Sequence, residues 1–122
     1  MKIILFILLF CLQAPLLQAE PLSIKHIVLC WLTNPGDAAL KETVIQTSRE
    51  LLNIPQVEAI SVGTSLPSDR KIVDDSFDVG MVMSFRDEKS LNEYLEHPYH
   101  LERVKNILAP SCEKILVYDI AY

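Results

Sequence analysis

Apolar residues dominate a ten-residue stretch from Ser23 to Leu32, which is rich in β-branched side chains and too short for a typical helix. We expect a β-strand that is covered on both faces. Alternate side chains of a strand point to opposite faces, so each side chain can be assigned to a face from the sequence. One face carries His26, Val28, Cys30 and Leu32, and the other carries Ile27, Leu29 and Trp31.

The pattern after this strand becomes helical. Residues 34–37 form a turn, Asp37 is a suitable N-cap, and a helix is predicted to continue to about Asn53. Residues 57–64 predict a second strand, and residues 76–85 alternate clearly with period two, which predicts a third. The core face of the third strand is expected to carry Phe77, Val79, Met81, Met83 and Phe85.

A proline divides the next helical segment. Asp87 is expected to cap a helix that ends before Pro98, and Pro98 opens a further helix that stops near Pro110. Residues 113–122 alternate again and predict a last strand. The order βαββαβ predicts an α+β, ferredoxin-like fold, with one antiparallel sheet and helices on one face.

The other face of this sheet would remain uncovered in a monomer, and uncovered apolar faces mark interfaces. We therefore expect a symmetric homodimer that buries the face with Ile27, Leu29 and Trp31.

The first residues form a separate segment. Lys2 is followed by a short apolar run, then by Pro15 and by the small residue Ala19. A charged start, an apolar run shorter than a bilayer span and a small residue at the end are typical of a signal peptide. We expect a signal peptide at residues 1–19, one domain at residues 20–122, and a secreted or periplasmic protein without a membrane anchor after cleavage.

Charge narrows the classes of partner. The chain has 122 residues and a net charge of −5, and removal of residues 1–19, whose single charged side chain is Lys2, would leave −6. An acidic chain without basic clusters argues against nucleic acid and anionic membrane surfaces as partners.

Two cysteines, Cys30 and Cys112, would remain in the chain after cleavage of the signal peptide. A ferredoxin-like sheet brings their strands together. The sequence therefore allows two alternatives, a disulfide or two buried free thiols.

The candidate chemistry lies at the predicted proline bend. Residues 94–100 contain two of the three histidines of the chain, His97 and His100, and two phenols, Tyr94 and Tyr99. Imidazole titrates near neutral pH and a phenol can donate or accept a hydrogen bond, so these groups suit proton transfer. They also suit structural roles, with His97 bonded to backbone at the helix end and Tyr94 filling the core.

Other reaction classes lack their motifs. The sequence contains no nucleotide-binding loop, no GxSxG and no HExxH. Asp69, Asp74, Asp75 and Asp78 do not have the spacing of a calcium loop. We expect no metal and no cofactor.

Several of these residues together resemble a known family. Residues 25–28 (KHIV), 76–79 (SFDV), 97–100 (HPYH) and 117–119 (VYD) resemble the stress-responsive dimeric A/B barrel domains, the Dabb family. The resemblance runs from about Ile24 to Ile120, which is nearly the whole chain after the expected signal peptide. It implies a dimeric α/β barrel, built from the two sheets of a homodimer.

The resemblance also suggests roles for individual residues. A characterised plant member of the family, olivetolic acid cyclase, closes a linear polyketide by aldol condensation. Similarity to it implies His100 as general base, Tyr94 as its partner and His26 as a pocket histidine. Val79 and Cys112 stand where the cyclase has a pocket histidine and a tryptophan.

Two functions follow as expectations. In the first, an exported, stress-response dimer binds a small apolar or phenolic molecule between sheet and helices. In the second, the same pocket performs acid–base chemistry of the aldol-cyclase or isomerase kind with His100 and Tyr94 as catalytic residues. A dimer without a ligand is a third alternative. The binding residues expected in the pocket are His26, Val28, Cys30, Met81 and His97.

Overall fold

The computed structural model describes residues 19–122. Residues 1–18, and with them nearly all of the expected signal peptide, lie outside the described residues. Within residues 19–122, no helix is both long enough and apolar enough to cross a membrane.

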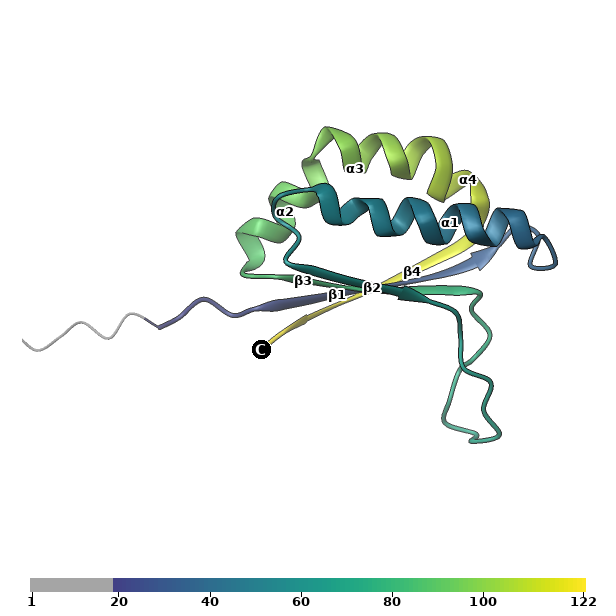
Figure 1. Cartoon of the computed structure of the whole chain (residues 1–122). Coiled ribbons are helices and arrows are strands. Elements are labelled where there is room, and N and C mark those ends of the chain that lie inside the picture. Colours follow the sequence, from purple (N-terminus) through teal and green to yellow (C-terminus); the bar gives the residue numbers. More distant parts are fainter. Residues whose placement is uncertain (1–18) are drawn as a thin grey trace, which may run out of the picture.

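A four-stranded antiparallel sheet forms one layer of the domain (Figure 1). Its strands are β1 (Ile24–Leu32), β2 (Ala59–Gly63), β3 (Val79–Phe85) and β4 (Cys112–Ala121), in the order β2-β3-β1-β4. The first strand in sequence is therefore central, and the last strand is an edge strand beside it.

The helices of the described part of the chain all lie on one face of this sheet (Figure 1). They are α1 (Ala38–Glu50) with the short 3₁₀ turn η1 (Leu51–Asn53), α2 (Glu88–Glu96), α3 (Pro98–Arg103), the π-helical turn η2 (Val104–Leu108) and α4 (Ala109–Ser111). This arrangement confirms the predicted α+β, ferredoxin-like βαββαβ fold.

Side-chain caps fix where the helices begin. The carboxylates of Asp37 and Asp87 accept hydrogen bonds from the backbone N–H groups of Leu40 and Ser90, at 3.0 and 2.7 Å. Both caps were predicted. At the bend between α2 and α3, Nδ1 of His97 accepts from the N–H of Tyr99 at 3.2 Å, directly before Pro98 begins the next helix.

The core lies between the sheet and the helices. Among its fully buried side chains are Leu32, Val44, Leu51, Phe85 and Tyr94. Leu32 lies on the same face of β1 as His26 and Cys30, and this face points toward the helices.

Within residues 19–122, no helix lies on the opposite face of the sheet (Figure 1). Ile27, Leu29 and Trp31 lie there, and Val82, Tyr118 and Ile120 on the neighbouring strands are 41%, 52% and 50% exposed. Residues 64–78 form the long connection that projects on this same side of the sheet.

One prediction about β3 is wrong. The strand begins at Val79, three residues later than expected, and Phe77 does not lie on the core face. Its ring packs against Trp31 on the uncovered face, with the ring centroids 6.4 Å apart. Asp78 is the reason: its backbone N–H donates to Cys30 O, and its carboxylate accepts from the N–H of Leu32 at 2.8 Å, so the strand alternation ends there.

The helical segment that begins at Pro98 ends near Pro110, as predicted, since its last turn, α4, ends at Ser111. The π-helical turn η2 precedes α4, and π-helical turns are frequent at functional sites.

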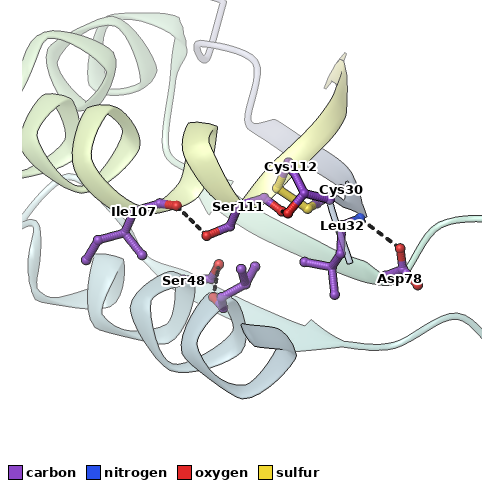
Figure 2. Close-up of a disulfide and its surroundings, with 9 residues drawn as sticks. Cys30, Leu32, Ser48, Asp78, Ile107, Ser111 and Cys112 are labelled. Carbon is purple, nitrogen blue, oxygen red and sulfur yellow. Dashed lines mark hydrogen bonds between the residues drawn. A yellow bond between two sulfur atoms is a disulfide. The ribbon is translucent and has the colours of Figure 1, made fainter. Parts of the chain in front are cut away.

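Cys30 and Cys112 form a disulfide, which decides the alternative that the sequence left open (Figure 2). Cys30 lies near the end of β1 and Cys112 begins β4, so the bond joins two neighbouring strands 82 residues apart in sequence. Beside it, the Ser111 hydroxyl donates to Ile107 O at 2.6 Å. The disulfide thus ties the end of the helical layer to the central strand.

Candidate functional site

A cavity of about 200 Å³ lies between the sheet and the helices. Its lining is apolar except for three side chains, His26, Tyr94 and His100. The edge strand contributes Ile115 and Val117, which are 41% and 43% exposed although they line the cavity. The cavity therefore opens to solvent along β4.

Tyr94 and His100 meet across the proline bend. Tyr94 lies on α2 and His100 on α3, and their ring centroids are 4.4 Å apart with an interplanar angle of 48°. Pro98 creates this geometry, because it ends one helix and starts the next at a new angle. Two side chains six positions apart thus reach the same cavity.

Burial governs the protonation of both groups. The pKa of the Tyr94 hydroxyl is raised well above its ordinary value, because burial disfavours the phenolate. The pKa of His100 is lowered, first by burial and further by the neighbouring His26 and His97, while its hydrogen bond to Leu95 opposes the shift. At neutral pH the cavity therefore presents a neutral phenol and a neutral imidazole.

A hydrogen bond to the backbone fixes the tautomer of His100. Nδ1 of the ring lies 3.0 Å from the carbonyl oxygen of Leu95, and a carbonyl oxygen can only accept. Nδ1 therefore carries the proton, which leaves Nε2 as the unprotonated nitrogen. Among the described residues, neither this Nε2 nor the Tyr94 hydroxyl has a side-chain or backbone hydrogen-bond partner.

His26 reaches the cavity from the central strand. It is 5% exposed, and its ring lies edge-on to Tyr94 with the centroids 6.0 Å apart. Its Nδ1 is 2.6 Å from Oδ1 of Asp119, the residue directly opposite on β4. The carboxylate accepts a hydrogen bond from Nδ1 and thereby orients the ring.

The structure brings most of the predicted site residues together. Val28, Cys30 and Met81 line the same cavity as His26, Tyr94 and His100. His97 does not: its ring is used to cap α3, outside the cavity lining. Whether any of these residues binds a ligand or catalyses a reaction stays a prediction.

Sequence analysis missed Asp119 as part of this site. It also missed the apolar walls contributed by Val104, Leu108, Ile115 and Val117 as cavity residues. Asp119 could have been found from the expected pairing of the first and last strands, since antiparallel partners on one face are neighbours. The cavity walls carry no such signal, because any buried aliphatic side chain has the same pattern.

The arrangement suits recognition of a small molecule that has one or two polar groups. The Tyr94 hydroxyl can donate a hydrogen bond, and Nε2 of His100 can accept one or take up a proton. Within residues 19–122, no group of three or more histidine, cysteine or acidic side chains is placed to hold a metal ion.

Solved structures share this architecture. The chain superposes on a hydroxynitrile lyase from Passiflora edulis with a TM-score of 0.72 and 24% identity, covering 84% of this chain and 94% of that one. A Dabb family protein from Mesorhizobium loti gives 0.66 and 24%, covering 81% and 95%. A dimeric ferredoxin-like protein of unknown function from Thermobifida fusca gives 0.67 and 22%, covering 87% and 96%.

No curated protein matches the chain at a significant level. The family profile described as "Stress responsive A/B Barrel Domain", Dabb, matches residues 24–122. This range includes every strand and helix of the described structure, together with the cavity and its three polar side chains. The chain therefore belongs to the Dabb family of stress-responsive A/B barrel domains.

Proposed function

We propose that this Dabb domain binds a small, largely apolar or phenolic molecule in the cavity between its sheet and its helices. The observation that carries the proposal is the convergence of His26, Tyr94 and His100 on one otherwise apolar cavity. Binding sites for small molecules combine an apolar lining with a few convergent polar groups in this way. The family's description as stress-responsive supports a role of this binding in a stress response.

The size of the cavity limits the ligand. Apolar cavities of about 150 Å³ admit benzene, whereas sites for drug-sized molecules measure about 300–1,000 Å³. The volume of about 200 Å³ in this protein fits a molecule with one ring or a short branched chain.

A binding screen with a blocked cavity tests this proposal. The protein is incubated with a metabolite extract, and retained molecules are identified by mass spectrometry. The variant Val117→Trp places a large side chain at the open edge of the cavity, and His100→Ala removes a polar group. Leu101→Trp is the control, because Leu101 is 54% exposed and does not line the cavity. Retained molecules should be lost in Val117→Trp and kept in the control; identical profiles in all variants would contradict binding in this cavity.

Acid–base catalysis in the same cavity is the second candidate. The close packing of the His100 and Tyr94 rings, 4.4 Å between centroids, favours it. Nε2 of His100 would remove a proton from a carbon next to a carbonyl group, and the Tyr94 hydroxyl would donate a hydrogen bond to the enolate oxygen that forms. The Passiflora hydroxynitrile lyase supports the idea that this fold can hold an enzyme. Exchange of the α-hydrogens of a bound ketone in D₂O, absent in His100→Ala, would test the step.

We also propose a homodimer that buries the uncovered sheet face. This face carries Ile27, Leu29 and Trp31. The long connection on the same side of the sheet carries Leu66 and Ile72, which are 82% and 91% exposed. Relatives of the same fold from Thermobifida fusca, Bacteroides fragilis and Jannaschia are described as dimeric. Two such faces packed together would exclude their apolar side chains from water.

Export of the protein is a further part of the proposal. It rests on the expected signal peptide at residues 1–19, and the Cys30–Cys112 disulfide supports it, because disulfides persist in oxidising compartments. The mass of the protein recovered from the secreted or periplasmic fraction should correspond to a chain that begins at Glu20.

A further inference from the structure

We propose that the cavity selects a neutral single-ring molecule that carries both a hydroxyl group and a carbonyl oxygen, and that it discriminates against carboxylates. The proposal rests on the binding function proposed above and names the class of ligand. Three features of the lining carry it: the absence of cations, the acceptor on His100 and the donor on Tyr94.

The part of the chain that the structure describes contributes no lysine and no arginine to the lining. The Asp119 carboxylate lies 2.6 Å from Nδ1 of the lining residue His26. The His26 ring is thus already engaged by a carboxylate of the protein. A carboxylate ligand would therefore lose water without gaining a free cation, and burial of an unpaired charge is strongly unfavourable.

His100 supplies a hydrogen-bond acceptor. Its Nδ1–H is used by the Leu95 carbonyl at 3.0 Å, and burial keeps the ring neutral by lowering its pKa. Nε2 therefore offers a lone pair and no hydrogen. The group on a ligand that satisfies it is a hydroxyl.

Tyr94 supplies the complementary donor. Burial raises the pKa of its hydroxyl, so the phenol keeps its proton at neutral pH. A carbonyl oxygen is the ligand group that accepts from it. Because the two rings lie 4.4 Å apart, one small molecule can reach both groups, whereas a molecule that lacks one of them leaves a buried polar atom unpaired.

Matched probes test this selection by calorimetry near neutral pH. 3'-Hydroxyacetophenone has both groups and no charge. 3-Hydroxybenzoate has the same ring and hydroxyl but is an anion, 3-ethylphenol lacks the carbonyl and acetophenone lacks the hydroxyl. We expect the affinity for 3'-hydroxyacetophenone to be at least about tenfold higher than the affinity for each of the other three probes.

Two tyrosine variants assign the effect to the cavity. Tyr94→Phe should lower the affinity for 3'-hydroxyacetophenone about tenfold and change that for 3-ethylphenol little. Tyr99→Phe is the matched control, because the Tyr99 hydroxyl bonds Glu50 and Arg103 outside the cavity lining. It should leave both affinities unchanged, and circular dichroism verifies that both variants fold.

The outcomes separate this proposal from the binding function. Binding of 3-hydroxybenzoate as tight as that of 3'-hydroxyacetophenone would overturn the proposed selection and leave the binding function standing. Equal losses of affinity for 3'-hydroxyacetophenone and 3-ethylphenol in Tyr94→Phe would likewise overturn the proposed selection and leave the binding function standing. Failure of all four probes to bind wild-type protein would also overturn the proposed selection, whereas the metabolite screen tests the binding function itself.

Discussion

His26 and Asp119 are hydrogen-bonded partners on neighbouring strands, although 93 residues separate them in sequence. Nδ1 of the buried imidazole lies 2.6 Å from the carboxylate oxygen, and the two residues are directly opposite in the β1–β4 register. The carboxylate is 47% exposed at the edge of the sheet, whereas the imidazole is 6% exposed. A group at the surface therefore orients a ring that lines the cavity.

The first prediction concerns this pair. Asp119→Asn keeps the shape of the side chain and one oxygen acceptor but removes the charge. We expect the free energy of unfolding to fall by about 1 kcal/mol, because a charge-assisted hydrogen bond becomes a neutral one and solvent already screens the half-exposed carboxylate. Urea denaturation measures the change. Asp69→Asn, in the exposed connection before β3, is the control and should alter stability by less than about 0.5 kcal/mol.

The second prediction is a pH dependence that comes from His100. Its pKa is lowered in the folded protein, chiefly by burial, so the unfolded chain takes up the proton more readily. The stability from this group is therefore complete above the unfolded pKa of about 6.5, and it is lost as the pH falls through that value toward the lowered folded pKa.

Denaturation of wild-type protein and of His100→Gln at about pH 7.5 and about pH 5 measures this effect. The variant should lose less stability than wild type between the two pH values, because glutamine does not titrate. Equal losses in both proteins would show that the His100 ring is not shielded from water.

The third prediction concerns the Cys30–Cys112 disulfide. It closes a loop with a sequence separation of 82 residues. Reduction, or the double replacement of Cys30 and Cys112 by alanine, should lower the free energy of unfolding by about 3–5 kcal/mol, since the unfolded chain gains entropy. Denaturation with and without a reductant measures the loss, and the double variant must be insensitive to the reductant.

The same disulfide forms part of the cavity wall, so its loss should also affect the proposed ligand site. Cys30→Ala with Cys112→Ala is expected to bind 3'-hydroxyacetophenone more weakly than oxidised wild type at a temperature where both are folded. Unchanged affinity would show that the wall keeps its shape without the bond.

Local patterns in the sequence predicted the fold and part of the site. Asp37 and Asp87 cap their helices as expected because capping depends on the next three residues alone. The face of β1 that carries His26 and Cys30 follows from strand alternation. Phe77 was placed on the wrong face because the Asp78 carboxylate binds the backbone of Leu32, a contact 46 residues distant.

The cavity itself could not be predicted from such patterns. It exists because the helices do not cover the cavity-side face of β4, where Val117 is 43% exposed, and that gap depends on how the helices pack on the sheet. The disulfide was one of two open alternatives, because strand order alone brings Cys30 and Cys112 near each other without fixing their distance.

The last prediction compares two valines with nearly equal exposure on opposite faces of the sheet. Val82 on β3 is 41% exposed on the face without helices, and Val117 on β4 is 43% exposed on the cavity side. Val82→Lys should convert the proposed dimer to a monomer, because each subunit would bury a charge against an apolar face. Val117→Lys adds the same charge outside that interface and should remain dimeric.

Light scattering coupled to size-exclusion chromatography measures the masses of both variants, with circular dichroism as a check of folding. A dimeric Val82→Lys protein would place the interface elsewhere, and a monomeric wild type would contradict the dimer.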